Sequence, residues 1–466
     1  MGALVVWMNG ELVATWRVGR TGHHRLDYVP SWRASARSRP LSLSLPFTAD
    51  NRLEGDVVRN YFDNLLPDSD GIRKRISSRF HTKGTDTFAL LQAVGRDCVG
   101  AVQLLPPGAT PDGFDQLRYE ALTPEQIEKH LGALGSQAGA GDQDDDESFR
   151  LSIAGAQEKT ALLQVNGQWC RPLGATPTTH ILKPPIGITP GRNLDLRLSV
   201  ENEWLCNQIV RELGLPAAEC QMQDFGARRV LVVKRFDRSW HPQDWIVRLP
   251  QEDFCQAKGV SSEQKYEQKG GPGIEACLAV LKGSEAFHED GRNFLCAQLL
   301  FWFLAAIDGH AKNFSLFVLP GGRYRMTPLY DVLSAWPLIG TGPYALQYKK
   351  TKLAMAVRGK TAHYKLSEIK VRHWEALAKR SAVQGAWDAM QGMTHRLETA
   401  LTAVEQRLPA DFPVELAHTV FKGVRQHLEQ FNRRAVLPDL AMNLPSKKNA
   451  PVKDRGAFES IESIGA

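Results

Sequence analysis

Hydrophobic and polar residues alternate in short segments in the first half of the chain and take a helical spacing in the second half. The first dozen residues alternate and turn at Asn9-Gly10, a residue pair favoured in type I′ hairpins. A second hairpin is predicted with Asn166-Gly167 at its tip. Two further strands are predicted, at residues 179–185 and 227–238.

Helical spacing begins with a short segment that follows Thr123. Pro124 stands at the first helical position and Gln126 three residues after the cap, as a capping box requires. Residues 199–215 have apolar positions at helical spacing, and from about residue 252 the pattern is mostly helical, including the very apolar run Phe294–Ile307. Strands followed by helices predict an α+β fold, two-lobed and with a mostly helical C-terminal lobe.

The clearest domain boundary is an acidic segment rich in glycine and serine, residues 135–148, which is typical of a flexible linker. It separates a small N-terminal α/β subdomain and a helix from the two-lobed part. The predicted division is 1–108 for the subdomain, 109–149 for helix and linker, 150–250 for the N-lobe, 251–440 for the helical C-lobe and 441–466 for a disordered tail.

Composition narrows the class of protein only slightly. The chain has 466 residues, 43% of them hydrophobic and 23% charged, as expected of an ordinary globular protein. Its 7 cysteines are scattered and form no CxxC pair, which favours a reducing compartment. No run is long enough to span a bilayer and the N-terminus lacks the basic region of a signal peptide, so we expect a cytoplasmic protein without membrane contact. The net charge of +6 permits a nucleic-acid partner without requiring one.

Three oxygen-bearing side chains follow the apolar run: Asp308, Asn313 and Asp331. In phosphoryl transfer, a carboxylate accepts the proton of the attacking hydroxyl, and an amide oxygen with a second carboxylate holds Mg²⁺. A predicted hairpin around Gly321-Gly322 would return Asp331 to the side of Asn313. The alternative is ordinary turn and capping chemistry. An EF-hand is excluded because His310 and Lys312 stand where oxygen ligands belong.

Upstream segments offer candidates for nucleotide binding. Lys183 lies on a short apolar strand, where a lone ammonium is costly unless it meets a phosphate, although a snorkelling lysine at a strand end is an equal alternative. Residues 152–159 are small and flexible enough to cup phosphates with backbone N–H groups. The strand that ends near Phe236 could present backbone groups to an adenine, although an ordinary core strand explains it as well.

Taken together, several segments resemble the HipA family of serine/threonine kinase toxins, which belong to type II toxin–antitoxin systems. The resemblance covers nearly the whole chain up to about residue 430, with the motifs in family order. The segments are 59–69 (RNYFDNLLPDS), 152–163 (SIAGAQEKTALL), 180–185 (HILKPP), 232–238 (VVKRFDR), 249–257 (LPQEDFCQA), 265–273 (KYEQKGGPG), 308–315 (DGHAKNFS), 328–335 (PLYDVLSA) and 408–413 (LPADFP).

The resemblance implies a role for each candidate residue. Asp308 is the implied catalytic base, and Asn313 with Asp331 the implied magnesium ligands. Ser152 is the implied autophosphorylation site, whose modification would expel the loop and silence the kinase. The implied ATP contacts are Ala154, Gly155, Ala156, Gln157, Glu158, Lys159, Lys183, Lys234, Arg235, Phe236, His310 and Lys312.

Lys234 departs from the family pattern, and the glutamate partner of Lys183 stays open between two residues. Lys234 stands where the family pattern leads us to expect glutamate, which puts nucleotide affinity in doubt unless that position contacts the base through its backbone alone. Glu201 and Glu203 are both placed to reach Lys183 as a kinase helix glutamate does, and the sequence does not choose between them.

The basic segment 359–383 would ordinarily be a solvated helical face. The resemblance implies a HipB-like antitoxin dimer bound to operator DNA, and Lys379 and Arg380 are our candidates for DNA phosphate contacts without sequence readout. It also implies growth arrest through ATP- and Mg²⁺-dependent phosphorylation of a protein such as an aminoacyl-tRNA synthetase, glutamyl-tRNA synthetase being the family precedent. The alternatives are a catalytically idle corepressor that binds antitoxin and operator, and a small-molecule kinase.

Overall fold

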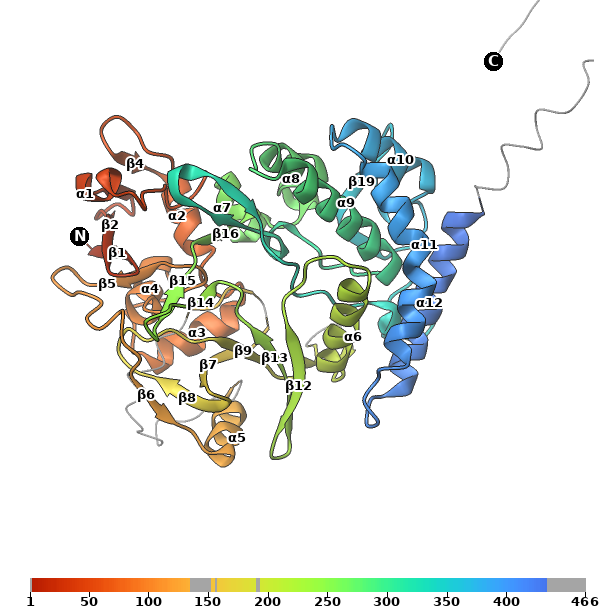
Figure 1. Ribbon diagram of the computed structural model, residues 1–466, viewed down its shortest axis with the longest axis horizontal. Coiled ribbons are helices and arrows are strands. Elements are labelled where there is room, and N and C mark those ends of the chain that lie inside the picture. Colours follow the sequence, from red (N-terminus) through yellow and green to blue (C-terminus); the bar gives the residue numbers. More distant parts are fainter. Residues whose placement is uncertain (1, 135–151, 156, 190–192, 434–466) are drawn as a thin grey trace, which may run out of the picture.

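The computed structural model describes residues 2–134, 152–155, 157–189 and 193–433 (Figure 1). The predicted acidic linker and the predicted C-terminal tail lie outside these residues. Within the described part, three groups of elements follow one another along the chain, and the fold is α+β as the sequence pattern predicts. In the same part, no helix is both long and apolar enough to cross a membrane.

A five-stranded antiparallel sheet forms the N-terminal subdomain, in the order β4-β3-β2-β1-β5. Asn9 and Gly10 both have positive φ, 45° and 80°, so the predicted hairpin turn is confirmed. Trp16 and Phe62 stack at 4.0 Å in the core that the helices cover. The elements are β1 Gly2–Met8, β2 Glu11–Val18, β3 His24–Tyr28, α1 Pro30–Ala34, β4 Arg52–Glu54, α2 Asp56–Asp63, α3 Asp70–Arg79, α4 Thr87–Val94 and β5 Gln103–Leu105.

The N-lobe is a six-stranded sheet in the order β12-β13-β9-β7-β8-β6, with helix α6 (Ser199–Glu212) packed against β12 and β13. The hairpin at Asn166 is confirmed, and so is the capping box of Thr123 and Gln126 at the start of α5 (Pro124–Ala133). The other elements are β6 Tyr119–Ala121, β7 Thr160–Val165, β8 Gln168–Pro172, β9 His180–Lys183, β10 Gly187–Ile188, β11 Asp195–Leu196, β12 Cys220–Phe225, β13 Arg228–Lys234, β14 Arg238–Trp240 and β15 Ile246–Arg248.

Helix α9 (Phe287–Leu304) runs through the centre of the C-lobe, between α8 and α11 in Figure 1. It begins earlier than the apolar run Phe294–Ile307. It also ends before Ile307, because Ala305 takes a left-handed conformation with φ of 49°. The remaining elements are β16 Gln251–Asp253, α7 Phe254–Lys258, η1 Ser262–Gln264, η2 Glu267–Lys269, α8 Ile274–Leu281, η3 Ala311–Asn313, β17 Ser315–Val318, η4 Pro320–Gly322, β18 Tyr324–Met326, η5 Trp336–Leu338, β19 Lys352–Arg358, β20 Ala362–Lys365, α10 Val371–Arg380, α11 Ala386–Glu405 and α12 Val414–Asn432.

A buried ionic cluster joins the N-terminal subdomain to the N-lobe. Asp97 accepts hydrogen bonds from Arg238 at 2.9 Å and from Arg248 at 3.2 Å, and Arg235 donates to Asp237 at 2.8 Å. Buried charges persist only when each is paired and hydrogen-bonded, as these are. The subdomain and the N-lobe are therefore held together by specific contacts as well as by apolar packing.

Candidate active site

The buried ammonium of Lys183, at the end of β9, has two carboxylate partners. Its Nζ lies 2.6 Å from Glu203 Oε1 on α6 and 2.6 Å from Asp331 Oδ1. The predicted contact of Lys183 with phosphates stays a prediction, because the partners of its ammonium in this structure are two carboxylates. Of the two candidate glutamates of α6, Glu203 is the one that reaches Lys183. Glu201 faces the other way, with Oε1 3.6 Å from Arg229.

Burial and charge pull the protonation of this group in opposite directions. Burial disfavours the charged form of Lys183, but the attraction of Asp331 and Glu203 outweighs it and the pKa of Lys183 is raised. Burial likewise opposes the charge of Asp331, yet Lys183 and Lys159 hold its pKa well below the usual range. Both groups are therefore charged at neutral pH. Burial raises the pKa of Glu203, the second carboxylate on the same ammonium.

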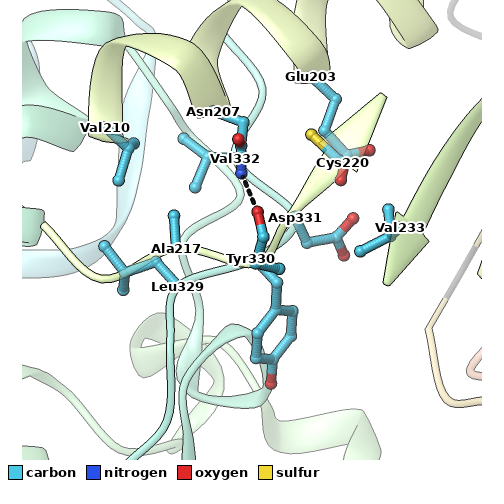
Figure 2. Close-up of a pocket in the computed structure, with 11 residues that line it drawn as sticks. Glu203, Asn207, Val210, Ala217, Cys220, Val233, Leu329, Tyr330, Asp331 and Val332 are labelled. Carbon is cyan, nitrogen blue, oxygen red and sulfur yellow. Dashed lines mark hydrogen bonds between the residues drawn. The ribbon is translucent and has the colours of Figure 1, made fainter. Parts of the chain in front are cut away.

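Figure 2 shows Glu203 and Asp331 beside the ends of β12 and β13, with the ring of Tyr330 pointing away from them. Tyr330 connects the Asp331 segment to the loop after α9, because its hydroxyl donates to the carbonyl of Lys312 at 2.9 Å. The predicted hairpin of β17 and β18 is confirmed, and it returns the chain to this point. Asp331, next in sequence to Tyr330, is thereby brought beside the loop that carries Asn313.

The loop after α9 exposes its carboxylate. The side chain of Asp308 is 64% solvent-accessible, while the Asn313 amide nitrogen donates to the Asp308 carbonyl at 2.8 Å. The amide nitrogen therefore stabilises the loop, and within the described residues no hydrogen bond is made to the side-chain oxygen of Asn313. Tyr266 donates its hydroxyl to Asp308 Oδ1. Tyr266 lies in one of the segments that resemble the HipA family, residues 265–273, but its side chain had no role predicted from the sequence.

His310 and Lys312 belong to the same loop, and their side chains are buried. Burial lowers the pKa of His310 to about 4, and among the residues that the structure describes, its buried Nδ1 has no hydrogen-bond partner. Lys312 Nζ donates to Asn64 Oδ1 at 2.9 Å and lies 3.5 Å from Asp253. The ammonium of Lys312 is therefore directed at the N-terminal subdomain, while the unpartnered nitrogen of His310 is the atom suited to an added ligand.

The segment predicted to form the phosphate loop lies against the N-terminal subdomain. Ser152 is fully buried, and its hydroxyl donates to the carbonyl of Leu65 at 2.7 Å. Gly155, with φ of 115°, accepts at its carbonyl from the Asp68 amide at 3.0 Å. Lys159 curls back to donate to the carbonyl of Ala154 at 2.9 Å.

The other residues of this segment are placed as follows. Gln157 donates to the carbonyl of Pro184 at 2.7 Å, next to Lys183 in sequence. Glu158 forms an ion pair with Arg75 of α3. Ala156 lies outside the described residues. Burial lowers the pKa of Lys159, although Asp331 attracts its charge. The structure therefore brings Lys159 and Lys183 into the field of the same carboxylate.

The predicted adenine hinge divides into three different environments. The side chain of Lys234 is exposed and pairs with Glu219 at 3.1 Å, so this lysine does not enter the site. Arg235 is buried in the ionic cluster described above, 2.8 Å from Asp237. Phe236 lies nearest the candidate site, with its ring centroid 5.8 Å from that of Tyr330.

The donor atoms fit magnesium and a nucleotide. Within the described residues, no three His, Cys, Asp or Glu side chains form a metal-binding group. Magnesium in nucleotide sites takes one or two carboxylates plus substrate phosphates and waters, which the Asp331 carboxylate and the Asn313 amide oxygen could complement. The buried, unpartnered nitrogen of His310 and the ammoniums near Asp331 suit a polyphosphate.

Both candidate DNA contacts are exposed at the end of α10 and already have acidic neighbours. Lys379 pairs with Glu375 at 2.8 Å, and Arg380 lies 3.4 Å from Glu275. A DNA phosphate would have to compete with these pairs, which are weak at an exposed surface.

A sheet lysine paired with a helix glutamate, opposite an Asp–Asn loop and a second aspartate, defines a kinase-like protein. The family within this class follows from the comparisons with known sequences. Residues 151–408 match the HipA-like C-terminal domain and residues 4–105 match the HipA N-terminal domain, so the chain belongs to the HipA family.

Individual relatives agree with this assignment. The chain is 33% identical to "Putative kinase Y4mE" of Sinorhizobium fredii over 82% of its own length and 86% of the relative. It is 30% identical to the serine/threonine-protein kinase toxin HipA of Shewanella oneidensis over 66% of its length and 69% of the relative. The fold matches HipA in the Shewanella oneidensis complex of HipA, HipB and operator DNA, with a TM-score of 0.74, 21% identity, and 92% and 97% of the two chains covered.

Proposed function

We propose that this protein is an ATP- and magnesium-dependent serine/threonine protein kinase and the toxin of a toxin–antitoxin pair. The observation that carries the proposal is Lys183, held at 2.6 Å by both Glu203 and Asp331 beside the Asp308 loop. Phosphoryl transfer requires a cation on the phosphates, a metal-binding carboxylate and a base for the acceptor hydroxyl. These three requirements have candidates within one site.

Asp308 is the proposed general base, because its carboxylate is the exposed acid of the loop. It takes the proton of the acceptor hydroxyl as the acceptor oxygen bonds to the γ-phosphorus and the bond from that phosphorus to ADP breaks. Asp331 and Asn313 would hold Mg²⁺, which supplies positive charge to the phosphate oxygens. Lys183, Lys159 and His310 would contact the phosphates, and Phe236 the adenine side.

Ser152 is the proposed site of self-modification. Its hydroxyl is buried and donates to the carbonyl of Leu65. A phosphate adds nearly two negative charges and three oxygens, which the buried position of Ser152 beside the Leu65 carbonyl does not accommodate. Phosphorylation would therefore release the segment and remove Gly155 and Lys159 from the nucleotide site.

The partners proposed for this chain are a HipB-like antitoxin and, through it, operator DNA. Support comes from the fold match to a HipA chain crystallised with HipB and its operator. The proposed protein substrate is an aminoacyl-tRNA synthetase, by analogy with the family precedent. Lys379 and Arg380 remain the proposed DNA phosphate contacts, and the protein is proposed to act in the cytoplasm.

The test is phosphate transfer from γ-labelled ATP, combined with intact-mass measurement of the purified chain. We expect one added phosphate in the wild type and none in Asp308→Ala. An equally unmodified wild type that still binds antitoxin and operator would favour an idle corepressor instead. Transfer to metabolites in place of proteins would indicate a small-molecule kinase.

A further inference from the structure

Tyr266 touches the carboxylate proposed as the catalytic base. Its hydroxyl donates a hydrogen bond to Asp308 Oδ1, and its ring stands edge-on to the ring of His310 at a centroid distance of 5.0 Å. Nε2 of the His310 ring is 3.9 Å from the same oxygen, which is beyond hydrogen-bonding distance. Tyr266 therefore holds one oxygen of the carboxylate in a defined direction.

The segment that carries Tyr266, residues 262–273, is fixed on both sides of the tyrosine. On one side, Lys265 Nζ lies 2.7 Å from Asp68 Oδ2 of the N-terminal subdomain. On the other side, Glu267 forms an ion pair with Arg358 of β19 and accepts from the Ala356 amide at 2.6 Å. The segment thus spans from the subdomain to the C-lobe, with Tyr266 between two anchors.

The backbone at Tyr266 is also closed into a tight turn. The amides of Lys269 and Gly271 both donate to the Tyr266 carbonyl, at 2.9 and 3.1 Å. Gly270 has φ of 91°, and a Cβ added to Gly271 would lie 1.8 Å from the carbonyl oxygen of Gln264, so both positions require glycine. With its backbone held, Tyr266 delivers its hydroxyl to Asp308 without ordering a loop at each turnover.

We propose that Tyr266 is a positioning residue for phosphoryl transfer: it holds Asp308 Oδ1 so that the other carboxylate oxygen is presented to the acceptor hydroxyl. The inference rests on the proposed kinase function. A general base acts only within hydrogen-bonding reach of the proton it accepts, and a base free to rotate spends much of its time elsewhere. A charge-assisted hydrogen bond from a rigid donor removes that freedom.

Tyr266→Phe tests the proposal because it removes only the hydroxyl. The assay follows phosphate transfer from γ-labelled ATP to the chain itself and to myelin basic protein, over a range of ATP concentrations. We expect the maximal rate to fall about 10- to 100-fold with the half-saturating ATP concentration unchanged. Tyr344→Phe, at a tyrosine that is 61% exposed, is the matched control and keeps the wild-type rate.

Other outcomes would overturn the proposal in distinguishable ways. A Tyr266→Phe rate equal to wild type would show that the hydrogen bond does nothing for transfer, and a faster rate would make Tyr266 a plug of the acceptor site. Phosphate found on Tyr266 by peptide mass spectrometry would make it an acceptor. A wild type without transfer would reject the kinase function itself, and this inference with it. A lowered melting temperature of Tyr266→Phe accompanied by a raised half-saturating ATP concentration would assign a purely structural role.

Discussion

Lys312, in the loop after α9, donates from Nζ to Asn64 of the N-terminal subdomain, at 2.9 Å to Oδ1 and 3.0 Å to the backbone carbonyl. The two residues are 248 positions apart in the chain. Asp68, four residues after Asn64, forms an ion pair with Lys265, and its backbone amide donates to the carbonyl of Gly155. The subdomain is therefore part of the wall of the candidate site.

Lys312→Met should destabilise the fold. Burial opposes the charge of Lys312, but Asp253 and Asp68 outweigh it and raise the pKa of the ammonium. Removing the cation leaves the buried carboxylate of Asp253 without its ion-pair partner, whereas Asp68 keeps Lys265. Breaking a buried ion pair in this way typically costs about 3–5 kcal/mol of the free energy of unfolding. Thermal melting measures the loss, with Lys282→Met at an exposed lysine as control. A normal melting temperature with weakened ATP binding would instead show that Lys312 reaches the nucleotide.

Local patterns predicted several elements of the fold, including the hairpin that leads to Asp331. Asn9-Gly10, Thr123 with Gln126, and the hairpin before Asp331 carry their own turn or capping chemistry, so a single sequence is enough to place them. The cost of burying an ammonium led to a predicted phosphate partner for Lys183, whereas its partners in this structure are the carboxylates of Glu203 and Asp331.

Contacts between distant segments were not predictable in the same way. The choice of Glu203 over Glu201 depends on how α6 rotates against the sheet, and Tyr266 meets Asp308 across 42 positions. Strand β6 (Tyr119–Ala121) is exposed at all three residues and has no alternating pattern, although it pairs with β8. Arg235 lay within a family motif, but the sequence did not show that its buried guanidinium pairs with Asp237 and also donates to the carbonyl of Cys98 in the N-terminal subdomain.

Asp331→Asn should abolish most phosphate transfer without unfolding the protein. Lys183 keeps Glu203 as a partner, so the buried ammonium remains compensated. The neutral amide is a weaker magnesium ligand than the carboxylate, and we expect the rate to fall at least about 100-fold and the half-saturating Mg²⁺ concentration to rise. Rates over a range of Mg²⁺ concentrations check this. Asp195→Asn, at an exposed aspartate paired with Arg197, should leave both quantities unchanged.

Glu252 should make stability depend on pH. Burial raises its pKa to about 8 from a value of 4.5 in the unfolded chain, and Oε1 accepts from the Leu43 amide at 2.9 Å. Between these two pH values the folded state keeps the proton of Glu252 and the unfolded state does not. The contribution of Glu252 to the free energy of unfolding is therefore fully present below about pH 4.5 and is lost as the pH rises through about 8.

Glu252→Gln stays neutral at every pH, so its melting temperature should match that of the wild type near pH 5 and exceed it increasingly toward pH 9. Glu263→Gln, at an exposed position, is the control for the loss of one negative charge. Parallel melting curves of wild type and Glu252→Gln across this range would contradict the prediction.

Phosphorylation of Ser152 should expose the segment around it to solvent. The serine amide donates to the Asp97 carbonyl at 3.2 Å and its hydroxyl to the Leu65 carbonyl, so the segment is protected only while both bonds persist. A phosphate on this oxygen ends its role as a donor and sets negative charge against a carbonyl oxygen. Hydrogen exchange of the Ser152 amide should accelerate after incubation with ATP and Mg²⁺ in the wild type. It should stay slow in Asp308→Ala, which keeps the serine but cannot modify it. Equal protection of the Ser152 amide from exchange in phosphorylated and unmodified chains would contradict the prediction. The buried position of Ser152 would then accept the phosphate, and self-modification would not act by releasing the loop.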